Sequence, residues 1–488
     1  MRHHWPTMDP AARLHRSTMA PWLILGLCAL IALVGQALFI PVDADVSWLI
    51  TVSERVLAGQ RLYVDVFEVN PPASVWLYLP QVALAHSLGL RPEAMIVGIA
   101  IMLALLSSAL TLRLARRLAE PPPSVIFAAA LGFVTLILPA GLFAQREHVA
   151  LLLALPLSVL LALVAERRAI TLRAAVAAGV ASGLIMVIKP HFVLAVATPA
   201  LLALWRSRAW RQFAIAVAAA AAVVALYALA IWWFAPAYLE RLDMLAELYI
   251  PMRERWARLL AGPVVLFPAA LAMLLLWLRR SRPRTLATML ALAALGFTIA
   301  ALIQGKGYWN HALPAVALLI VAVAIEALAA PADRRRLTYI ALASIALGSV
   351  ASTARIGPPP GLVATLRSVA PANPTMITLG TELATGHPAV RLVDGRWVGS
   401  RAALFTAAGV RYRAAGGRRR PSASLERWYR EDLNVLASEI AANRPDVILV
   451  EIEDLPWLGR EPEVRPLLVD YRRAARAGTI EIWIRRGQ

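Results

Sequence analysis

Long apolar stretches separated by short charged ones fill this chain up to about residue 354. A spanning helix needs about 20 predominantly apolar residues. Runs without formal charge, long enough or nearly long enough to span, occur at 20–41, 94–112, 124–144, 149–165, 174–188, 191–205, 212–234, 259–278, 285–304, 311–325 and 337–354. The pattern therefore predicts an α-helical polytopic membrane protein with about eleven spans.

One further stretch, residues 70–90, is ambiguous. Its three prolines, with Gln81 and His86, make it a poor spanning helix and fit an interfacial one. The positive-inside rule decides the matter. If residues 70–90 do not span, all loops with arginine clusters lie on the same side as the basic N-terminus, which the rule places in the cytoplasm. If they did span, these loops would face outward, against the rule. These clusters lie at 113–117, 167–173, 206–211, 279–284 and 334–336. We therefore expect eleven spans, with residues 1–19 in the cytoplasm.

The pattern changes at about residue 355. Pro and Gly cluster there, and a helix-like segment at 425–443 lies among short β-rich stretches. These stretches are 375–380, 446–452 and 479–485. They predict a small soluble α/β domain over 355–488, after a transmembrane domain over 20–354 that includes an outer loop at 42–93. An odd number of spans places the α/β domain outside.

Composition narrows the class of protein. A hydrophobic content of 60% and a mean hydropathy of +0.65 exclude an ordinary soluble globule. The net charge of +19 lies mostly in short arginine clusters between apolar runs, so it anchors helices and does not indicate nucleic-acid binding. The single cysteine, Cys28, allows no intramolecular disulfide.

The predicted topology gathers the polar motifs on the outer side. Among 49 basic residues the lysines are Lys189 and Lys306, each at the end of an apolar run and near a histidine. A lysine ammonium is a compact charge suited to phosphate oxygens, and glycines beside Lys306 allow close approach of a ligand. The alternative is that both lysines reach the membrane interface as anchors.

Further candidates for a phosphate site lie on the same side. Arg146 offers a bidentate partner for phosphate, and the histidines offer donors or acids. These histidines are His148, His191 and His311. Arg146 could instead pair with Glu147 or Glu68. The set of histidines and carboxylates could hold a divalent metal, but no pair has zinc-like local spacing, so no cofactor is assigned.

Two carboxylates follow the first span directly. Asp43 or Asp45 could take the proton of an acceptor hydroxyl as a general base, or could cap the helix that begins there. The remaining candidates are expected to position substrate. They are Glu68, Tyr308, Trp309 and Asn310, although Trp309 also fits an interfacial aromatic belt.

Over about residues 40–330 the sequence resembles the GT-C superfamily of polyprenyl-phosphate-sugar-dependent glycosyltransferases, of the protein O-mannosyltransferase and aminoarabinose transferase type. The matching residues are Asp43 and Asp45, then AGQRLYVDVFEVNPPASVWLYLP (58–80), then RLARRL (113–118). The sequence departs from the family pattern at two places. Asn70 stands before the two prolines, where a lysine is usual, and Asp43-Ala-Asp45 replaces a pair of adjacent acidic residues.

The resemblance implies an inverting transfer of sugar, at the outer face of the membrane, from a polyprenyl-phosphate donor in the membrane lipid to an acceptor glycan, lipid or protein. Its site would face the periplasm of a bacterial inner membrane, with an Asp as general base. Two other functions remain open from the sequence: a transporter or flippase of lipid-linked or anionic substrates, and a glycan polymerase or ligase. A transporter would carry charges near the middle of its spans, whereas here they lie at span ends.

Overall fold

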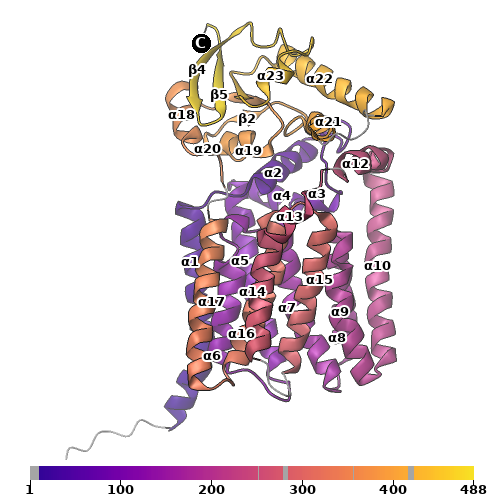
Figure 1. The fold of residues 1–488 in the computed structure, drawn as a ribbon, viewed down its shortest axis with the longest axis vertical. Coiled ribbons are helices and arrows are strands. Elements are labelled where there is room, and N and C mark those ends of the chain that lie inside the picture. The colour runs from indigo at the N-terminus through magenta and orange to yellow at the C-terminus, as the bar shows by residue number, and fades with distance from the viewer. Residues whose placement is uncertain (1–9, 251, 279–283, 355–356, 416–421, 488) are drawn as a thin grey trace, which may run out of the picture. The chain divides into compact units, whose positions relative to one another are not determined.

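The computed structural model describes residues 10–250, 252–278, 284–354, 357–415 and 422–487 (Figure 1). Residues 1–9 of the predicted N-terminal segment and most of the arginine cluster at 279–284 lie outside this description. The chain forms two compact units. Unit 1 contains Met1–Phe39, Val97–Val224 and Trp256–Ala354, and unit 2 contains Ile40–Ile96, Ala225–Arg255 and Arg355–Gln488.

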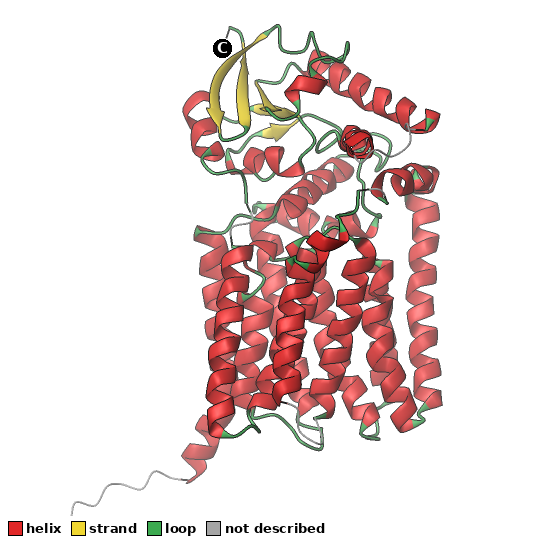
Figure 2. Ribbon diagram, viewed as in Figure 1, coloured by secondary structure: helices red, strands yellow, loops and turns green. Residues whose placement is uncertain are grey.

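Unit 1 is a bundle of helices joined by short loops (Figure 2). Its helices are α1 (Pro10–Leu38), α5 (Pro92–Ala115), α6 (Ser124–Gly132), η1 (Phe133–Ile137), η2 (Ala140–Leu142), α7 (Arg146–Ala165), α8 (Leu172–Ile188), η3 (Pro190–Phe192), α9 (Val193–Ser207), α10 (Trp210–Phe234), α13 (Trp256–Leu260), α14 (Pro263–Leu278), α15 (Thr285–Gln304), α16 (Trp309–Ala327) and α17 (Ala332–Thr353). The first residues of α5, up to Ile96, and the last residues of α10, from Ala225, belong to unit 2. Helix α16 is apolar around its whole circumference and is enclosed by α6, α7, α14, α15 and α17.

The predicted spans coincide with these helices. Within the described residues, seven helices are long and apolar enough to cross a membrane, and three shorter apolar helices accompany them. The ambiguous stretch 70–90 forms two short helices, α3 (Ala73–Trp76) and α4 (Leu79–Ser87). Nine residues of helix rise only about 14 Å, less than half of a hydrocarbon core. The chain is thus a multi-pass membrane protein, and 70–90 does not span as a helix.

Hydrogen bonds gather the arginine-rich loops of unit 1 at one end of the bundle. Arg117 donates to the Ala169 carbonyl at 2.8 Å, and the Ala119 amide donates to Glu166 at 2.8 Å. We call this end the arginine end. The loops that carry Lys189 and Lys306 join helices at their other ends, which we call the lysine end. This alternation is the one that the arginine clusters predicted.

Unit 2 contains the predicted α/β domain. Its five-stranded sheet has the order β2-β1-β3-β5-β4, with β1, β2 and β3 parallel and β5 antiparallel to both of its neighbours. The strands are β1 (Thr375–Leu379), β2 (Arg396–Trp397), β3 (Val447–Glu451), β4 (Tyr471–Ala477) and β5 (Ile480–Arg485). The helices of this C-terminal region are α18 (Leu362–Val369), α19 (Leu383–Gly386), α20 (Ala389–Leu392), α21 (Phe405–Ala415), α22 (Ala423–Asn443) and α23 (Leu455–Leu458).

The carboxyl ends of β1 and β3 are closed by a carboxylate. Glu451 accepts hydrogen bonds from the amides of Thr381 and Glu382, each at 3.0 Å, and from the Thr385 hydroxyl at 2.7 Å. A Cβ on Gly380 would lie 2.3 Å from the Glu451 carboxyl carbon, so this position requires glycine. Burial raises the pKa of Glu451 to about 7. These bonds satisfy the carboxylate, and we interpret it as structural.

Three segments far apart in sequence share an apolar core in unit 2. Phe67 packs with Leu248 of α12 (Leu242–Tyr249) and Leu425 of α22. The other two elements of unit 2 are α2 (Ala44–Leu57) and α11 (Pro236–Glu240). Segments that share a core lie on the same side of a membrane. This core requires an even number of spans between Phe67 and Leu248 and between Leu248 and Leu425. The eleven-span topology, which stays a prediction, has even numbers there.

Candidate functional site

The lysine end of unit 1 brings three loops together. Helix α8 ends at Lys189 because Pro190 follows, which disfavours helical conformation in the residue before it. Helix α15 ends at Gly305, and both Gly305 and Gly307 have φ of +71°, a conformation that favours glycine. Helix α7 begins at Arg146 after an extended Gln145. Each polar motif thus lies where a span begins or ends.

Glu147, in the first turn of α7, is the centre of this cluster. Its Oε1 accepts a bond from the Lys189 Nζ at 2.6 Å and from the Asn310 Nδ2 at 3.2 Å. The His311 Nε2 lies 3.7 Å from the same oxygen. Lys189 also donates to the Gln304 Oε1 at 3.4 Å. Side chains from two other segments, at Lys189 and at Asn310 and His311, therefore converge on one carboxylate oxygen, as they would on an oxygen of an anionic ligand.

The cluster is deeply buried and rich in positive charge. The relevant exposures are 0% for Glu147, 6% for Arg146 and 7% for each of the two lysines, Lys189 and Lys306. Lys189 and Arg146 are the lysine and arginine whose charges act on Glu147, so these three residues carry two positive charges and one negative charge. Burying a charge is costly unless opposite charges and hydrogen bonds compensate it. An arrangement of this kind favours an anion, such as a phosphate group.

Three polar atoms of this cluster are buried without a hydrogen-bond partner among the described residues. They are the Glu147 Oε2, the His191 Nε2 and the His311 Nδ1. Buried polar atoms are normally paired with protein or with ordered water. Three such atoms on adjoining loops indicate a place that water or a ligand group completes.

His148 has a different environment from the other predicted histidines. The Ala144 amide donates to its Nδ1 at 3.1 Å, so the Nε2–H donates to the Thr135 carbonyl at 2.8 Å. Its ring is fully buried beside Phe143. Both ring nitrogens thus hold the turn between η1 and α7, and the structure does not bring His148 to the Glu147 oxygen.

The aromatic pair in the loop before α16 divides between two environments. Tyr308 is 63% exposed, and its ring centroid lies 5.7 Å from that of His311. Trp309 packs against Phe267 of α14, with ring centroids 4.6 Å apart. Tyr308 therefore offers an open ring face next to the cluster, whereas Trp309 anchors the start of the helix.

The two aspartates of the sequence prediction lie in unit 2, at the N-terminus of α2. Asp43 is the N-cap: its Oδ1 accepts the Asp45 amide at 2.8 Å, and its side chain is buried. Asp45 lies in the first helical turn and is half-buried. A helix N-terminus stabilises a carboxylate there. The two residues therefore have distinct structural positions, which their spacing did not reveal.

Glu68 holds the loop that follows α2. Its Oε2 accepts the Trp48 indole N–H at 2.5 Å, and its Oε1 accepts the Asn70 amide at 2.8 Å and the Asn70 side chain at 2.6 Å. Glu68 is 1% exposed. It connects α2 to the Asn-Pro-Pro turn, so its observed contacts are those of a residue that supports the fold.

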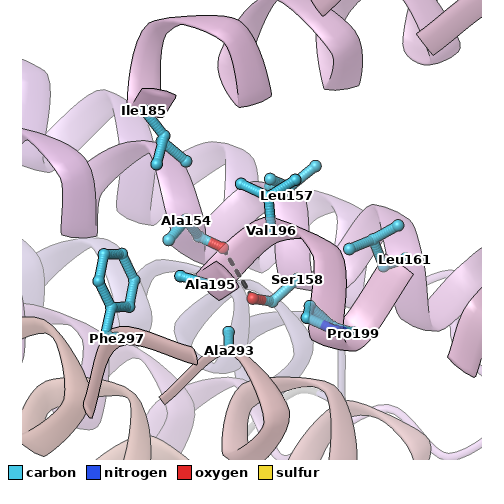
Figure 3. A pocket seen from close by; sticks show the side chains of 10 residues that line it. All are labelled: Ala154, Leu157, Ser158, Leu161, Ile185, Ala195, Val196, Pro199, Ala293 and Phe297. Atoms are coloured by element: carbon cyan, nitrogen blue, oxygen red, sulfur yellow. Dashed lines mark hydrogen bonds between the residues drawn. The ribbon is translucent and has the colours of Figure 1, made fainter. Parts of the chain in front are cut away.

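A separate, shallow apolar pocket, too small to enclose a water molecule, lies among α7, α8, α9 and α15 (Figure 3). Its one side-chain hydroxyl, that of Ser158, donates to the Ala154 carbonyl at 2.8 Å. Phe297 lines the pocket and packs against Phe192, with ring centroids 4.9 Å apart. The pocket offers no polar group for a phosphate or a sugar, and we do not assign it to the site.

A metal does not fit the arrangement. In the part of the chain that the structure describes, no three side chains of His, Cys, Asp or Glu are placed to hold an ion together. The cationic cluster around Glu147 would also repel a divalent cation. No step of the chemistry below is therefore assigned to a metal.

Comparisons with family models and with curated protein sequences find no match. Comparison of the fold finds ArnT from Cupriavidus metallidurans. Its apo structure matches with a TM-score of 0.57 and 13% identity, covering 96% of this chain and 98% of ArnT. Its structure bound to undecaprenyl phosphate matches with a TM-score of 0.54 and 12% identity, covering 97% and 98%. The chain has the GT-C fold.

This match confirms the resemblance inferred from the sequence at the level of fold. It also extends the resemblance beyond residues 40–330 to nearly the whole chain, including the C-terminal region, in which no motif could be matched. At 12–13% identity the match does not carry the roles of individual residues. Those roles rest on the geometry given above.

Sequence reasoning missed two members of the cluster, Glu147 and Gln304. Glu147 was considered only as a partner for Arg146, and Gln304 as the last residue of an apolar run. One signal could have indicated Glu147. It is a carboxylate in the first turn of an apolar helix, and it sits on the same predicted side as both lysines.

Proposed function

We propose that this protein is a membrane glycosyltransferase that moves a sugar from a polyprenyl-phosphate donor to an acceptor hydroxyl. The observation that carries the proposal is the buried cationic cluster around Glu147, in a chain that has the GT-C fold. A second support is that the similar fold of ArnT has been seen with undecaprenyl phosphate bound, which is a carrier of the class proposed here. The site would face the periplasm of a bacterial inner membrane, since the opposite loops carry the arginine clusters.

The phosphate of the donor would bind at the lysine end. Lys189 and Lys306 would act as compact point charges, with Arg146 as a fork and His311, His191 and Asn310 as hydrogen-bond donors. As the anomeric carbon–oxygen bond to phosphate breaks, negative charge grows on the leaving phosphate. Fixed positive charges in a buried site stabilise that charge more in the transition state than in the ground state.

The acceptor would be activated by the aspartates at the start of α2. The acceptor oxygen attacks the anomeric carbon from the face opposite the phosphate, so the configuration inverts, and its proton passes to a carboxylate. We assign that carboxylate to Asp45. Asp43 is committed to capping the helix, whereas Asp45 is half-buried in the first turn. Tyr308, with its exposed ring, is a candidate surface for the sugar.

A transporter or flippase is a weaker reading of the same chain. Such proteins place charged residues near the middle of their spans, on the substrate pathway. In the seven spanning helices that the structure describes, Asp, Glu, Lys and Arg lie within five residues of a helix end. The charges gather at the bundle end instead, where a lipid headgroup would be bound. The acceptor could be a glycan, a lipid or a protein.

The test is direct. Purified protein in detergent is incubated with a panel of undecaprenyl-phosphate sugars and an extract of envelope acceptors, and products are followed by mass spectrometry. We expect release of undecaprenyl phosphate coupled to transfer with at least one donor, and none with Asp45→Asn. Failure of the parent protein to bind undecaprenyl phosphate at all would overturn the proposal.

A further inference from the structure

The C-terminal domain contacts α2 through α19 and through the segment that follows it. We call that following segment, residues 387–400, the α2 clamp. This segment contains α20 and β2 and lies beside the parallel part of the sheet. All of its contacts described below lie within unit 2. They join the C-terminal domain to the helix on which the candidate base is carried.

One contact of the clamp is a set of ion pairs between Arg391 and two carboxylates, Glu54 and Glu93. The Arg391 Nη1 and Nη2 donate to the two carboxylate oxygens of Glu54 at 2.8 and 3.0 Å, and its Nε donates to Glu93 at 2.5 Å. The guanidinium is 15% exposed. A bidentate bond between arginine and carboxylate fixes orientation as well as distance. Arg391 therefore holds the C-terminal half of α2 against the start of α5.

The second contact lies near the other end of α2. The His387 Nδ1 is 3.4 Å from the Ser47 hydroxyl, and the imidazole ring lies between Trp48 and Trp397, at centroid distances of 5.2 and 4.7 Å. His387 is fully buried. Trp48 is fixed in turn by Glu68, which accepts its indole N–H. The first turns of α2 are thus held from two sides.

The two contacts are spaced to fix the direction of the helix. Ser47 and Glu54 are seven residues apart, which is close to two full turns, so they lie on the same face and about 10 Å apart along the axis. A third bond runs from the Arg55 guanidinium to the Gly399 carbonyl. A rigid body that is held at two separated points on one face can neither tilt nor rotate freely.

We propose that the α2 clamp positions Asp45 for catalysis, and that Arg391 and His387 are its positioning residues. Asp45 lies two residues before Ser47, so the angle of α2 sets where its carboxylate points. The C-terminal domain thereby acts on the reaction through α2. This inference rests on the proposed function for the role of Asp45, but the clamp itself is a physical claim that can be tested without activity.

The test uses the full-length protein in detergent. Arg391→Met removes the ion pairs, and Arg391→Lys keeps one charged bond but loses the bidentate geometry. Arg473→Met is the matched control, because Arg473 pairs with Glu481 on the exposed β4–β5 hairpin of the same domain. Hydrogen exchange of residues 44–57 reports the clamp, and transfer kinetics report the position of Asp45.

In Arg391→Met we expect faster exchange in 44–57 and a loss of kcat of about 10- to 100-fold, the size of effect that a small misplacement of a catalytic group produces. The KM for the lipid donor should stay unchanged, and Arg391→Lys should recover part of kcat. Arg473→Met should change neither reading. Unchanged exchange in Arg391→Met would overturn the clamp. Faster exchange with unchanged kcat would overturn the positioning role, whereas an inactive parent protein would instead count against the proposed function.

Discussion

The cluster around Glu147 in unit 1 and the N-terminus of α2 in unit 2 are built on opposite principles. In the first, donors from two segments converge on one buried carboxylate oxygen, and three polar atoms lack a partner among the described residues. In the second, Asp43 caps the helix and Glu68 accepts three hydrogen bonds from its neighbours. In the first arrangement cationic side chains gather around one carboxylate, whereas in the second a cap and a carboxylate hold the backbone of a helix start and of the loop that follows it.

This difference assigns different tasks to the two regions. A site with buried cations gains from taking up an anion, so it suits binding and charge stabilisation. A helix start that is held by a cap and by neighbouring side chains keeps a fixed orientation, so it suits a group that must point in one direction. Each region can be tested by comparing a substitution that removes a charge with one that keeps the local hydrogen bonding.

The largest effect is expected for the base. Asp45→Asn should lower transfer by about 10²- to 10⁴-fold, because an amide cannot take the acceptor proton. Asp43→Asn should leave transfer close to that of the parent, since asparagine caps a helix as well as aspartate does. Turnover at saturating donor, with a thermal melt of each variant, checks both. Loss of activity in Asp43→Asn with normal Asp45→Asn would reverse the assignment.

Next in size is the buried ion pair. Lys189→Met leaves Glu147 charged and buried without its nearest partner, so the free energy of unfolding should fall by about 3–5 kcal/mol. Adding Glu147→Gln to Lys189→Met should restore most of that stability, because the double variant removes both members of the ion pair and leaves no carboxylate unpaired. Denaturation of the three variants in detergent measures this. No recovery in the double variant would contradict a direct pairing of the two charges.

The fold was largely predictable because its signals are local. Apolar runs of span length identify the helices, and their positions agree with the structure from α1 to α17. The short β-rich stretches at 375–380, 446–452 and 479–485 correspond to β1, β3 and β5. Strand β4 was missed because its sequence, YRRAARA, is rich in arginine and alanine rather than in β-branched residues.

The site was predictable only in part because its contacts are not local. Both lysines and His311 were identified, but Glu147 binds partners 42 and 163 residues away, which no local pattern shows. Likewise, no sequence signal joins Phe67 to Leu425. The sequence slightly favoured Asp43 as the base because it lies nearest the end of the first span, whereas the cap geometry is the basis for proposing Asp45.

A smaller effect is expected for Lys306. Lys306→Ala should weaken use of the donor by about 1.5–3 kcal/mol, the value of a hydrogen bond to a charged group. Lys306→Arg should recover only part of this, because a planar guanidinium does not replace a compact ammonium in a glycine-flanked loop. Transfer rate against donor concentration measures both. Full activity in Lys306→Arg would return Lys306 to the role of an interfacial anchor.

The smallest effect is a pH dependence in unit 2. Burial, with the charge of Arg391, lowers the pKa of His387 from 6.5 to about 3. The folded state therefore keeps His387 neutral, and its contribution to stability is present above pH 6.5 and is lost as the pH falls toward 3. By pH 5 the loss should be about 1–2 kcal/mol. Thermal midpoints at pH 5 and 7 should differ less in His387→Asn than in the parent; an equal difference would contradict this.

The central claim is that the lysine end of unit 1 binds the phosphate of a lipid carrier. The most direct measurement is the affinity of the purified protein for undecaprenyl phosphate, compared among the parent, Lys189→Met and the stable double variant Lys189→Met/Glu147→Gln. We predict that binding weakens by about 10- to 100-fold in both variants, because both lack the same charged bond. Parent-like affinity in the double variant, which is expected to fold normally, would contradict the account.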